Sequence, residues 1–382
     1  MKKMETTNFD DIRPYTDAEL PAAMQRIASH RFFPILAYYV YPGANIDDVR
    51  QKLLSFKTIR DFQLEVMRRV NEQVIQRSIS HFTCNGLDRL KATTSYLYVS
   101  NHRDIMLDAS LLEYALFLHG FDTTEITFGA NLMQGELVTD IGKCNKMFRV
   151  ERPGGNWRDF YHASVHLSRY IHHTITEKHQ SVWIAQRNGR TKNGMDATDQ
   201  GIIKMFGMAR TDDKVGALSA LHIVPVSVSY EWEPCDILKT LELYASQSGR
   251  YTKKPGEDLN SILTGVMQPK GDVHFEVCAP ITDAELKALD PLTSNEYHKA
   301  VAHLLDTRIV SAYHLFPNNY IAYDLRYGCN KYQQMYTTEQ REAFVNHMKE
   351  LDRYDTCNME QLYDLFLSIY ANPIVNKRKM NE

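Results

Sequence analysis

The chain has 382 residues, a formal net charge of −3 and a hydrophobic fraction of 43%. This length suits one large domain or a main domain with a smaller appended one, and the composition is that of an ordinary globular protein. The small net charge argues against a general nucleic-acid binder, and no apolar run reaches the roughly 20 residues that span a bilayer. The N-terminus turns acidic before any apolar run begins, so we expect no signal peptide and a cytoplasmic chain. The six cysteines include no CxxC pair, which argues against a zinc site.

The first 90 residues show a mainly helical pattern. Apolar residues recur three and four positions apart over residues 47–56 and 59–79, which is typical of amphipathic helices. Within this region, residues 32–41 combine aromatic and aliphatic side chains with arginines just before them, a composition that suits a membrane interface. Core packing under a helix explains the same pattern, so both interpretations stay open.

From residue 96 onward, predicted strands and helices alternate along the chain. This alternation predicts an α/β fold with a mostly parallel central sheet flanked by helices. We expect a helical N-terminal lobe over residues 1–90, the α/β domain over residues 91–330, and C-terminal helices over residues 331–382. The expected strands are 96–100, 125–130, 182–186, 222–230 and 273–279, the expected helices end near 118 and span 157–176, and a surface loop is expected over 246–258.

A histidine and two carboxylates follow the strand predicted at residues 96–100. His102 lies just beyond its end, with Asp104 and Asp108 shortly after it. A carboxylate that orients the imidazole ring and stabilises the imidazolium lets a histidine act as a general base on a hydroxyl group. A polar turn with no catalytic role is the commoner structure for a histidine near an aspartate. Taken alone, this block therefore supports either interpretation.

Three further blocks carry cationic side chains or a proline inside a strand pattern. Paired arginines before a Gly-Gly turn, and a loop with three cations and two glycines, are suited to binding phosphate. Isolated arginines are more often solvated at a strand edge. A proline in a strand indicates an edge or a bulge, where a ligand wall can form. The residues concerned are Arg149 and Arg152 in the first block, Arg187, Asn188, Gly189, Arg190 and Lys192 in the second, and Val224 and Pro225 in the third.

In order and spacing, the four blocks resemble the four motifs of the glycerolipid acyltransferase family over about residues 90–280. That family esterifies glycerol-3-phosphate or lysophosphatidic acid from an acyl thioester. The resemblance implies His102 as the general base, Asp108 as its partner, and Arg190 as a phosphate ligand. The whole candidate site comprises His102, Asp108 and Asp104 for catalysis, Arg103, Arg149, Arg152, Arg187, Asn188, Gly189, Arg190 and Lys192 for substrate binding, and Val224 and Pro225 as a wall.

Two departures from the family pattern bear on this site. Five residues separate His102 from Asp108, where the family has four. One extra residue in a helical first turn rotates a side chain by roughly 100°, so Asp104 is an alternative partner for the histidine. The usual glutamate of the third motif is replaced by Asn188, which keeps hydrogen-bonding capacity and loses a negative charge.

The resemblance implies an O-acyltransferase of phospholipid biosynthesis. It implies transfer of a fatty acyl group from acyl-ACP or acyl-CoA to a hydroxyl of glycerol-3-phosphate, lysophosphatidic acid or a related lyso-lipid, without a metal or cofactor. The expected partners are the acyl carrier protein or CoA thioester, the acceptor, and the inner face of the membrane. Backbone amides at the helix start and Arg103 are candidate oxyanion donors. A catalytically silent lipid- or carrier-binding homologue and a thioester hydrolase are the alternatives, although no GxSxG elbow is present.

Overall fold

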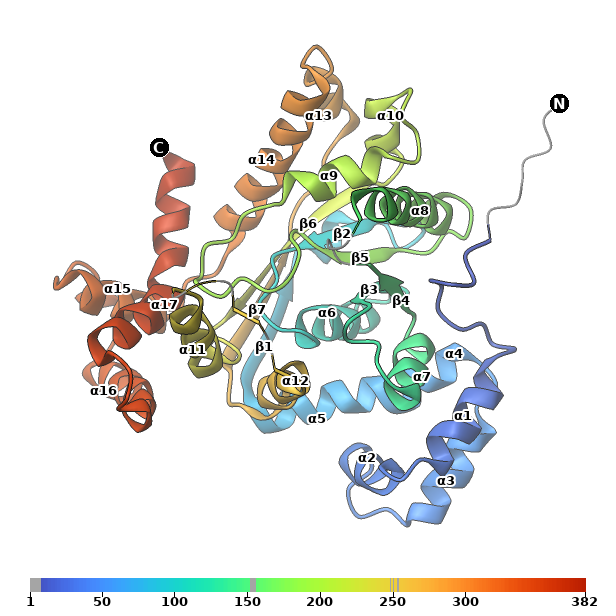
Figure 1. Cartoon of the computed structure of the whole chain (residues 1–382), viewed down its shortest axis with the longest axis horizontal. Coiled ribbons are helices and arrows are strands. Elements are labelled where there is room, and N and C mark those ends of the chain that lie inside the picture. The colour runs from blue at the N-terminus through green and yellow to red at the C-terminus, as the bar shows by residue number, and fades with distance from the viewer. Residues whose placement is uncertain (1–7, 152–155, 248, 250, 253) are drawn as a thin grey trace.

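The computed structural model describes residues 8–151, 156–247, 249, 251–252 and 254–382. A seven-stranded sheet lies at its centre (Figure 1). The strands are β1 (Ile79–Asn85), β2 (Leu97–Ser100), β3 (Glu125–Gly129), β4 (Met147–Val150), β5 (Val182–Ala185), β6 (Ile223–Tyr230) and β7 (Gly271–Val277). They follow the order β1-β7-β6-β2-β5-β3-β4, and every neighbouring pair is parallel except β6 and β7. The predicted α/β fold with a mostly parallel sheet is confirmed.

The central strands are buried on both faces, as expected for parallel strands that helices cover. Successive side chains of a strand alternate between the two faces, so Leu97 belongs to one hydrophobic core and Tyr98 to the other. Leu97 pairs in register with Val182 of β5 and with Ile223 of β6. The five predicted strands all form, within two residues of the expected bounds. Two strands, β1 and β4, were not predicted, because both lie at sheet edges and their side chains are partly exposed.

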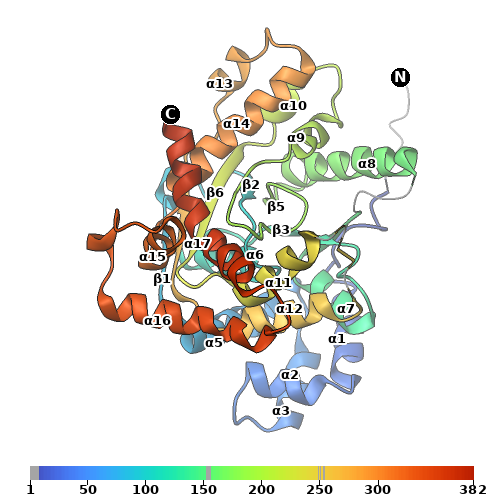
Figure 2. The same cartoon turned by 60° about the vertical axis from the view of Figure 1, so that its left-hand side comes forward.

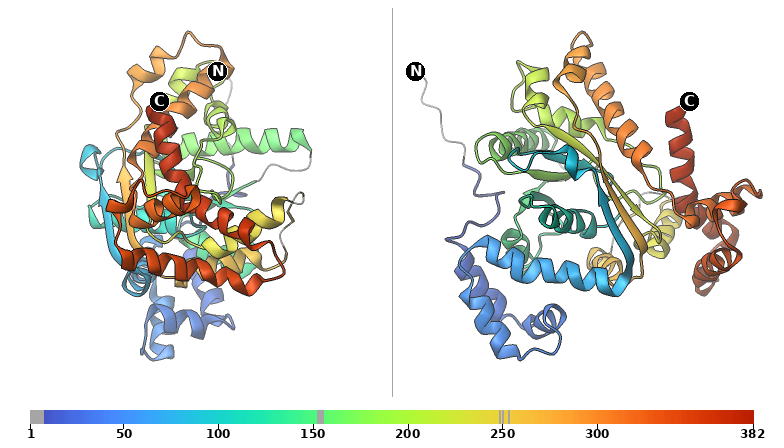
Figure 3. Two further views of the ribbon diagram at one scale, coloured as in Figure 1. Left: turned by 90° about the vertical axis from the view of Figure 1, so that its left-hand side faces the viewer. Right: turned by 180° about the vertical axis from the view of Figure 1, so that it is seen from behind.

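Two helical layers cover the sheet (Figure 3). One core packs the sheet against α8 (Trp157–Thr176), α9 (Gln200–Gly207), α10 (Lys214–Ser219), α13 (Asp283–Ala288) and α14 (Ser294–Ala312). The opposite core packs it against α5 (Arg68–Ser78) and α6 (Leu107–Leu118). The helix predicted at 157–176 and the one predicted to end near 118 therefore form as expected.

The N-terminal helices form a separate hydrophobic core with α7 (Glu136–Cys144). They are α1 (Leu20–Ser29), α2 (Phe33–Val40), α3 (Ile46–Ser55), α4 (Ile59–Phe62) and the π-helical turn η1 (Gln63–Met67), which continues into α5. Residues 79–85, predicted as part of the helical lobe, instead form β1 and join the sheet beside β7. Within the described residues, no helix has both the length and the apolar character needed to cross a bilayer.

Two helical segments lie outside these layers. An insertion between β6 and β7 forms α11 (Asp236–Gln247) and α12 (Glu257–Met267), which the sequence pattern did not predict. After α14, the chain forms α15 (Pro317–Tyr327), η3 (Gln333–Met335), α16 (Thr338–Met348), η4 (Lys349–Tyr354) and α17 (Met359–Asn381). One further short helix, η2 (Leu87–Arg89), lies between β1 and β2. Figure 2 shows α17 beside α11, and their side chains share one hydrophobic core.

Pro225 lies in a central strand whose pairings keep a regular register, so the prediction that it marks a sheet edge or a bulge is wrong. The carbonyl oxygen of Pro225 accepts a hydrogen bond from the amide of Cys278, just beyond the end of β7. The nitrogen and carbonyl of one strand residue face the same side. The missing N–H of Pro225 therefore falls where the ladder with β7 has ended. Proline is tolerated here because the residue opposite it, Cys278, lies outside β7, so no hydrogen bond within the β6–β7 ladder is lost.

Candidate active site

His102 lies in the turn that joins the central strand β2 to α6. Its Nδ1 atom lies 2.8 Å from Oδ2 of Asp108, whose side chain is fully buried. An ionised carboxylate only accepts hydrogen bonds, so Nδ1 carries the hydrogen and Nε2 keeps the lone pair. This is the tautomer that a general base needs.

The extra residue of the first block lies in the turn rather than in the helix. Residues 101–106 are not helical, and α6 begins at Leu107, so Asp108 occupies its first turn. Oδ1 of Asp104 accepts hydrogen bonds from the amides of Met106 and Leu107 and so caps α6. The expected rotation of about 100° therefore does not occur, and Asp108 rather than Asp104 is the partner of His102.

Four donors hold the Asp108 carboxylate in place. Besides His102, Oδ2 accepts from the amides of Arg103 and Asp104, at 2.6 and 3.0 Å, and Oδ1 accepts from the hydroxyl of Tyr230 at 2.9 Å. Burial beside Asp108 raises the pKa of Tyr230 well above its usual range, so its hydroxyl stays a donor. The amides of Arg103 and Asp104 donate to Asp108, and those of Met106 and Leu107 donate to Asp104, so these four amides are already paired in the turn.

Two aromatic residues that the sequence interpretation missed fix the histidine and its partner. The Trp183 ring packs edge-to-face on His102 with centroids 5.8 Å apart, and its indole nitrogen donates to Oγ of Ser100. Tyr230 ends β6 and reaches Asp108 from the neighbouring strand. Both are large aromatic residues within predicted strands, and each carries one polar atom that needs a hydrogen-bond partner when it is buried. That combination is the feature of the sequence that could have identified them.

We expect Tyr230→Phe to lower kcat about tenfold, since a hydrogen bond to a charged group contributes roughly 1.5 kcal/mol or more. Without this donor, the Asp108 carboxylate keeps three of its four hydrogen bonds and orients the His102 ring less firmly. The loss should appear in kcat with both KM values unchanged, because Tyr230 lines neither cavity at the site. A normal kcat in a folded variant would show that Tyr230 has no positioning role.

An apolar cavity of about 460 Å³ opens beside His102. It lies between the sheet and the helices α8 and α9, and an alkyl chain matches its surface. Its apolar and aromatic lining includes Ile105, Phe128, Leu132, Val150, Trp157, Phe160, Tyr161, Leu167, Trp183, Ile184, Ile202, Met205 and Met208.

A second, polar cavity of about 450 Å³ shares six lining residues with the first: His102, Ile105, Leu132, Arg187, Asn188 and Gly189. The loop after β5 lines it with Arg187, Asn188, Gly189, Arg190, Lys192 and Asn193, and the α11–α12 insertion contributes Leu243, Ser246 and Asp258. The amide of Thr191 donates to the carbonyl of His102, which ties this loop to the catalytic turn. The histidine therefore lies where an apolar and a cation-lined cavity meet.

Arg190 is the cation of this loop with the clearest unmet binding capacity. It is about nine-tenths buried, and its Nη1 makes no hydrogen bond within the described part of the chain. A buried guanidinium nitrogen without a partner is costly, and an anionic ligand removes that cost. Lys192 differs, since it forms an ion pair with Glu242. The structure thus brings the predicted third block to the cavity.

Several predicted site residues lie elsewhere. Arg103 is fully buried in ion pairs with Asp196 and Glu233, so it does not line either cavity. Arg149 is exposed on the edge strand β4 and pairs with Glu151, while Arg152 lies outside the described residues. Val224 and Pro225 are buried within the sheet and form no wall of these cavities.

Helix α17 holds the polar loop from behind. Nδ2 of Asn372 donates to the carbonyl of Asn193, and Nδ2 of Asn376 donates to that of Asp196. Gly194 has a φ of +74°, and a Cβ atom there would collide with the carbonyl oxygen of Ile369. Only glycine fits this contact without strain.

We expect Gly194→Ala to lower the free energy of unfolding by about 2–5 kcal/mol, from backbone strain of about 1–2 and overpacking of about 1–3. Gly189→Ala is the matched control. Its φ of +75° is nearly the same, and no atom lies within 4 Å of the added Cβ. Chemical denaturation of both variants separates the cost of backbone strain, which both share, from the cost of the collision, which only Gly194→Ala has. Equal losses in the two variants would show that α17 does not pack tightly on the loop.

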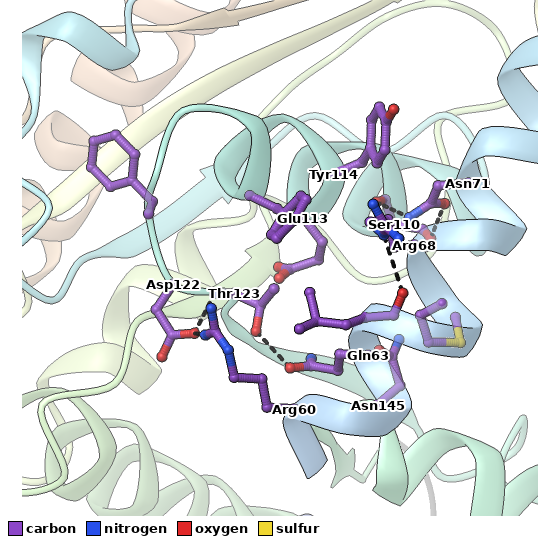
Figure 4. A pocket seen from close by; sticks show the side chains of 14 residues that line it. Arg60, Gln63, Arg68, Asn71, Ser110, Glu113, Tyr114, Asp122, Thr123 and Asn145 are labelled. Atoms are coloured by element: carbon purple, nitrogen blue, oxygen red, sulfur yellow. Dashed lines mark hydrogen bonds and ion pairs between the residues drawn. The ribbon is translucent and has the colours of Figure 1, made fainter. Parts of the chain in front are cut away.

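A third cavity, of about 40 Å³, lies between η1, α5 and α6 and contains none of the predicted site residues (Figure 4). Its polar groups satisfy each other: Gln63 accepts from Thr123, and Asn71 exchanges hydrogen bonds with Ser110. Burial raises the pKa of Glu113 to about 7, and the carboxylate accepts from Thr124. This cavity is a packing feature with internally paired groups.

The fold and the site together define a class: an α/β domain with a buried His–Asp pair between an apolar and a cation-lined cavity. Residues 81–229 match the family model described as Acyltransferase. This segment, which contains His102, Asp108 and Arg190, is therefore similar to an acyltransferase domain. The predicted resemblance and enzyme class are confirmed.

The other comparisons are distant. Among solved structures, the chain is similar to the 1-acyl-sn-glycerophosphate (LPA) acyltransferase PlsC from Thermotoga maritima, with 12% identity and a TM-score of 0.34. The match covers 75% of this chain and 92% of that one. The likeness is too low to map residues of one chain onto the other. No curated protein matches the chain at a significant level.

Proposed function

We propose that this acyltransferase moves a fatty acyl group from acyl-ACP or acyl-CoA to a hydroxyl of glycerol-3-phosphate, lysophosphatidic acid or a related lyso-lipid in phospholipid biosynthesis. One observation carries the proposal: His102 lines both the apolar and the cation-lined cavity. An alkyl chain in the first cavity and an anionic acceptor in the second would place thioester and hydroxyl on either side of its Nε2 atom.

In this mechanism, Nε2 of His102 removes the proton from the acceptor hydroxyl. The oxygen attacks the thioester carbonyl, the C–S bond breaks, and the imidazolium returns the proton to the leaving thiolate. Asp108 stabilises the imidazolium between these steps through the 2.8 Å contact to Nδ1. The reaction balances with an acyl thioester and a hydroxyl alone, so we expect no metal or cofactor.

Arg190 is the proposed ligand of the acceptor phosphate, supported by Arg187 at the same cavity. Asn188 lines both cavities in place of the family's glutamate, so the polar cavity has one negative charge fewer than it would have with glutamate. That change favours an anionic acceptor. The partners of the reaction are the acyl carrier protein or CoA thioester, the acceptor, and the inner face of the cytoplasmic membrane.

The serine closest to His102 in the sequence does not supply the nucleophile that a serine-type thioester hydrolase needs. Ser100 is fully buried, and its hydroxyl donates to the carbonyl of Asn101. A silent binding homologue would not need the four donors that hold Asp108.

The test is incubation of purified full-length protein with labelled palmitoyl-ACP or palmitoyl-CoA and a panel of glycerol-3-phosphate, lysophosphatidic acid and hydroxyl-bearing lyso-aminolipids. We expect an ester on one acceptor that carries a phosphate. Free fatty acid as the sole product would support a hydrolase. No turnover with any pair would support the silent homologue.

A further inference from the structure

Helix α11 faces the active site with one side and α17 with the other. Leu243 and Ser246 line the polar cavity. Lys239 precedes Leu243 by four residues, and Glu242 precedes Ser246 by four, so these side chains lie on the same side of the helix. The other side contributes to the core that is shared with α17 through Ile237, Leu241 and Tyr244.

Lys239 binds the main chain next to the catalytic histidine. Its Nζ atom donates to the carbonyl of Arg103 at 2.7 Å. The N–H of the same peptide unit, which belongs to Asp104, donates to Oδ2 of Asp108 at 3.0 Å. The carbonyl and the N–H of this trans peptide point in opposite directions, and a cation at the carbonyl polarises the N–H and strengthens its hydrogen bond. Lys239 therefore acts on Asp108, the partner of His102, through one peptide unit.

The burial of Lys239 also points to a role in geometry. It belongs to a cluster of two cations and two carboxylates whose side chains are each at most 5% exposed. Lys239 pairs with Glu233 at 2.6 Å. Arg103 pairs with Glu233 at 3.4 Å and with Asp196 at 2.5 Å. Buried ion pairs contribute little net stability, because apolar groups of similar size often serve as well or better. The main consequence of the cluster is therefore the position of the chain segments that carry it.

Glu242 makes a matching contact with the polar loop. Its carboxylate forms an ion pair with Lys192, in the loop that carries Arg190. One side of α11 thus contacts both the turn with His102 and the loop with Arg190, and α17 supports the helix from behind. Because α11 is held between these parts, the Nζ atom of Lys239 has a fixed position relative to the turn.

We infer that Lys239 is a positioning residue for acyl transfer; this inference rests on the proposed function. Lys239 lines neither cavity at the site, so it acts through other residues rather than on the substrate. It holds the peptide unit before Asp104, which in turn holds Asp108 beside His102. A displacement of about 1 Å at the reacting atoms costs roughly 10²-fold in rate, so a contact two steps from the histidine affects turnover.

The test is steady-state ester formation by two variants of the full-length protein. Lys239→Met keeps most of the side-chain volume and removes the donor, but it leaves Glu233 without its lysine. The double variant Lys239→Met with Glu233→Gln restores the charge balance of the cluster. We expect kcat to fall roughly 10–100-fold in both variants with both KM values unchanged, while the double variant unfolds at a higher denaturant concentration than the single one. Wild-type kcat in the double variant would overturn the inference.

Lys146→Met is the matched control for these variants. Lys146 also donates to a main-chain carbonyl, that of Thr123, and it pairs with Asp122 at 3.5 Å. It lines neither cavity at the site, so its replacement should leave kcat unchanged. A fall in kcat equal to that of Lys239→Met would show a general loss of rigidity in place of a positioning role.

Hydrogen exchange measured by mass spectrometry separates this inference from the proposed function, because it needs no substrate. The amides that are hydrogen-bonded within the turn are those of Arg103, Asp104, Met106 and Leu107. We expect them to exchange about tenfold or more faster in the double variant, while α8 keeps its protection. Faster exchange in the turn without ester formation by the wild type would contradict the proposed function alone. Unchanged exchange in the turn, or equal acceleration in α8, would contradict the role given to Lys239.

Discussion

Replacing His102 by alanine is expected to lower the rate of acyl transfer by roughly 10²–10⁴-fold, the usual contribution of a positioned general base. The acceptor hydroxyl then keeps its proton, and a neutral hydroxyl attacks a thioester slowly. Both KM values should change little, because the cavities keep their other lining residues. The measurement is steady-state ester formation with the acceptor identified in the panel.

His119→Ala is the matched control for this variant. His119 lies on the exposed C-terminal end of the same helix α6, with Nδ1 near the carbonyl of Ala115. It lines neither cavity at the site, so its replacement should leave the rate unchanged. Normal turnover in His102→Ala with an intact fold would remove His102 from the mechanism.

The second large effect is expected for Arg190→Ala. A charge-assisted hydrogen bond to an anion contributes about 1.5–3 kcal/mol, so kcat/KM for the phosphate-bearing acceptor should fall about 10–150-fold. The loss should appear mainly in KM for the acceptor, while KM for the acyl donor stays constant. Arg190→Lys should recover only part of it, because an ammonium cannot form the forked contact of a guanidinium.

Arg149→Ala tests whether Arg149 binds the acceptor, as the family pattern implies, or stays outside the site, as in the structure. The second motif implies a phosphate ligand at this position, whereas the structure shows an exposed arginine paired with Glu151. We expect wild-type kinetics. A raised acceptor KM would instead mean that Arg149 reaches the acceptor when substrate is bound, and that both cavity arginines need reassessment.

The sequence was sufficient for the sheet core because its signals are local. Mainly apolar runs predicted β2, β5 and β6, since burial on both faces leaves few polar positions in these strands, and the helical period predicted α8. The position of His102 after β2 follows from the same reading, as does the loop with Arg190. The local sequence of these elements is enough to predict them.

The choices among like residues could not be made from the sequence. Asp104 and Asp108 follow His102 by two and six residues, and only the non-helical turn before Leu107 decides that Asp108 pairs with it. Arg103 and Arg190 both lie in polar blocks of the sequence, yet Arg103 is held in buried ion pairs with Asp196 and Glu233. Each of these partners lies about 90 residues or more away in the chain.

By itself, the sequence determined the α/β class, the strand that delivers His102, and the polar loop that delivers Arg190, because hydrophobic period and residue type act over short distances. The tertiary structure alone decided the His102–Asp108 pair, the support from Tyr230, and the meeting of two cavities at one histidine. These features depend on residues that are far apart in the chain and become neighbours only when parallel strands bring their ends together.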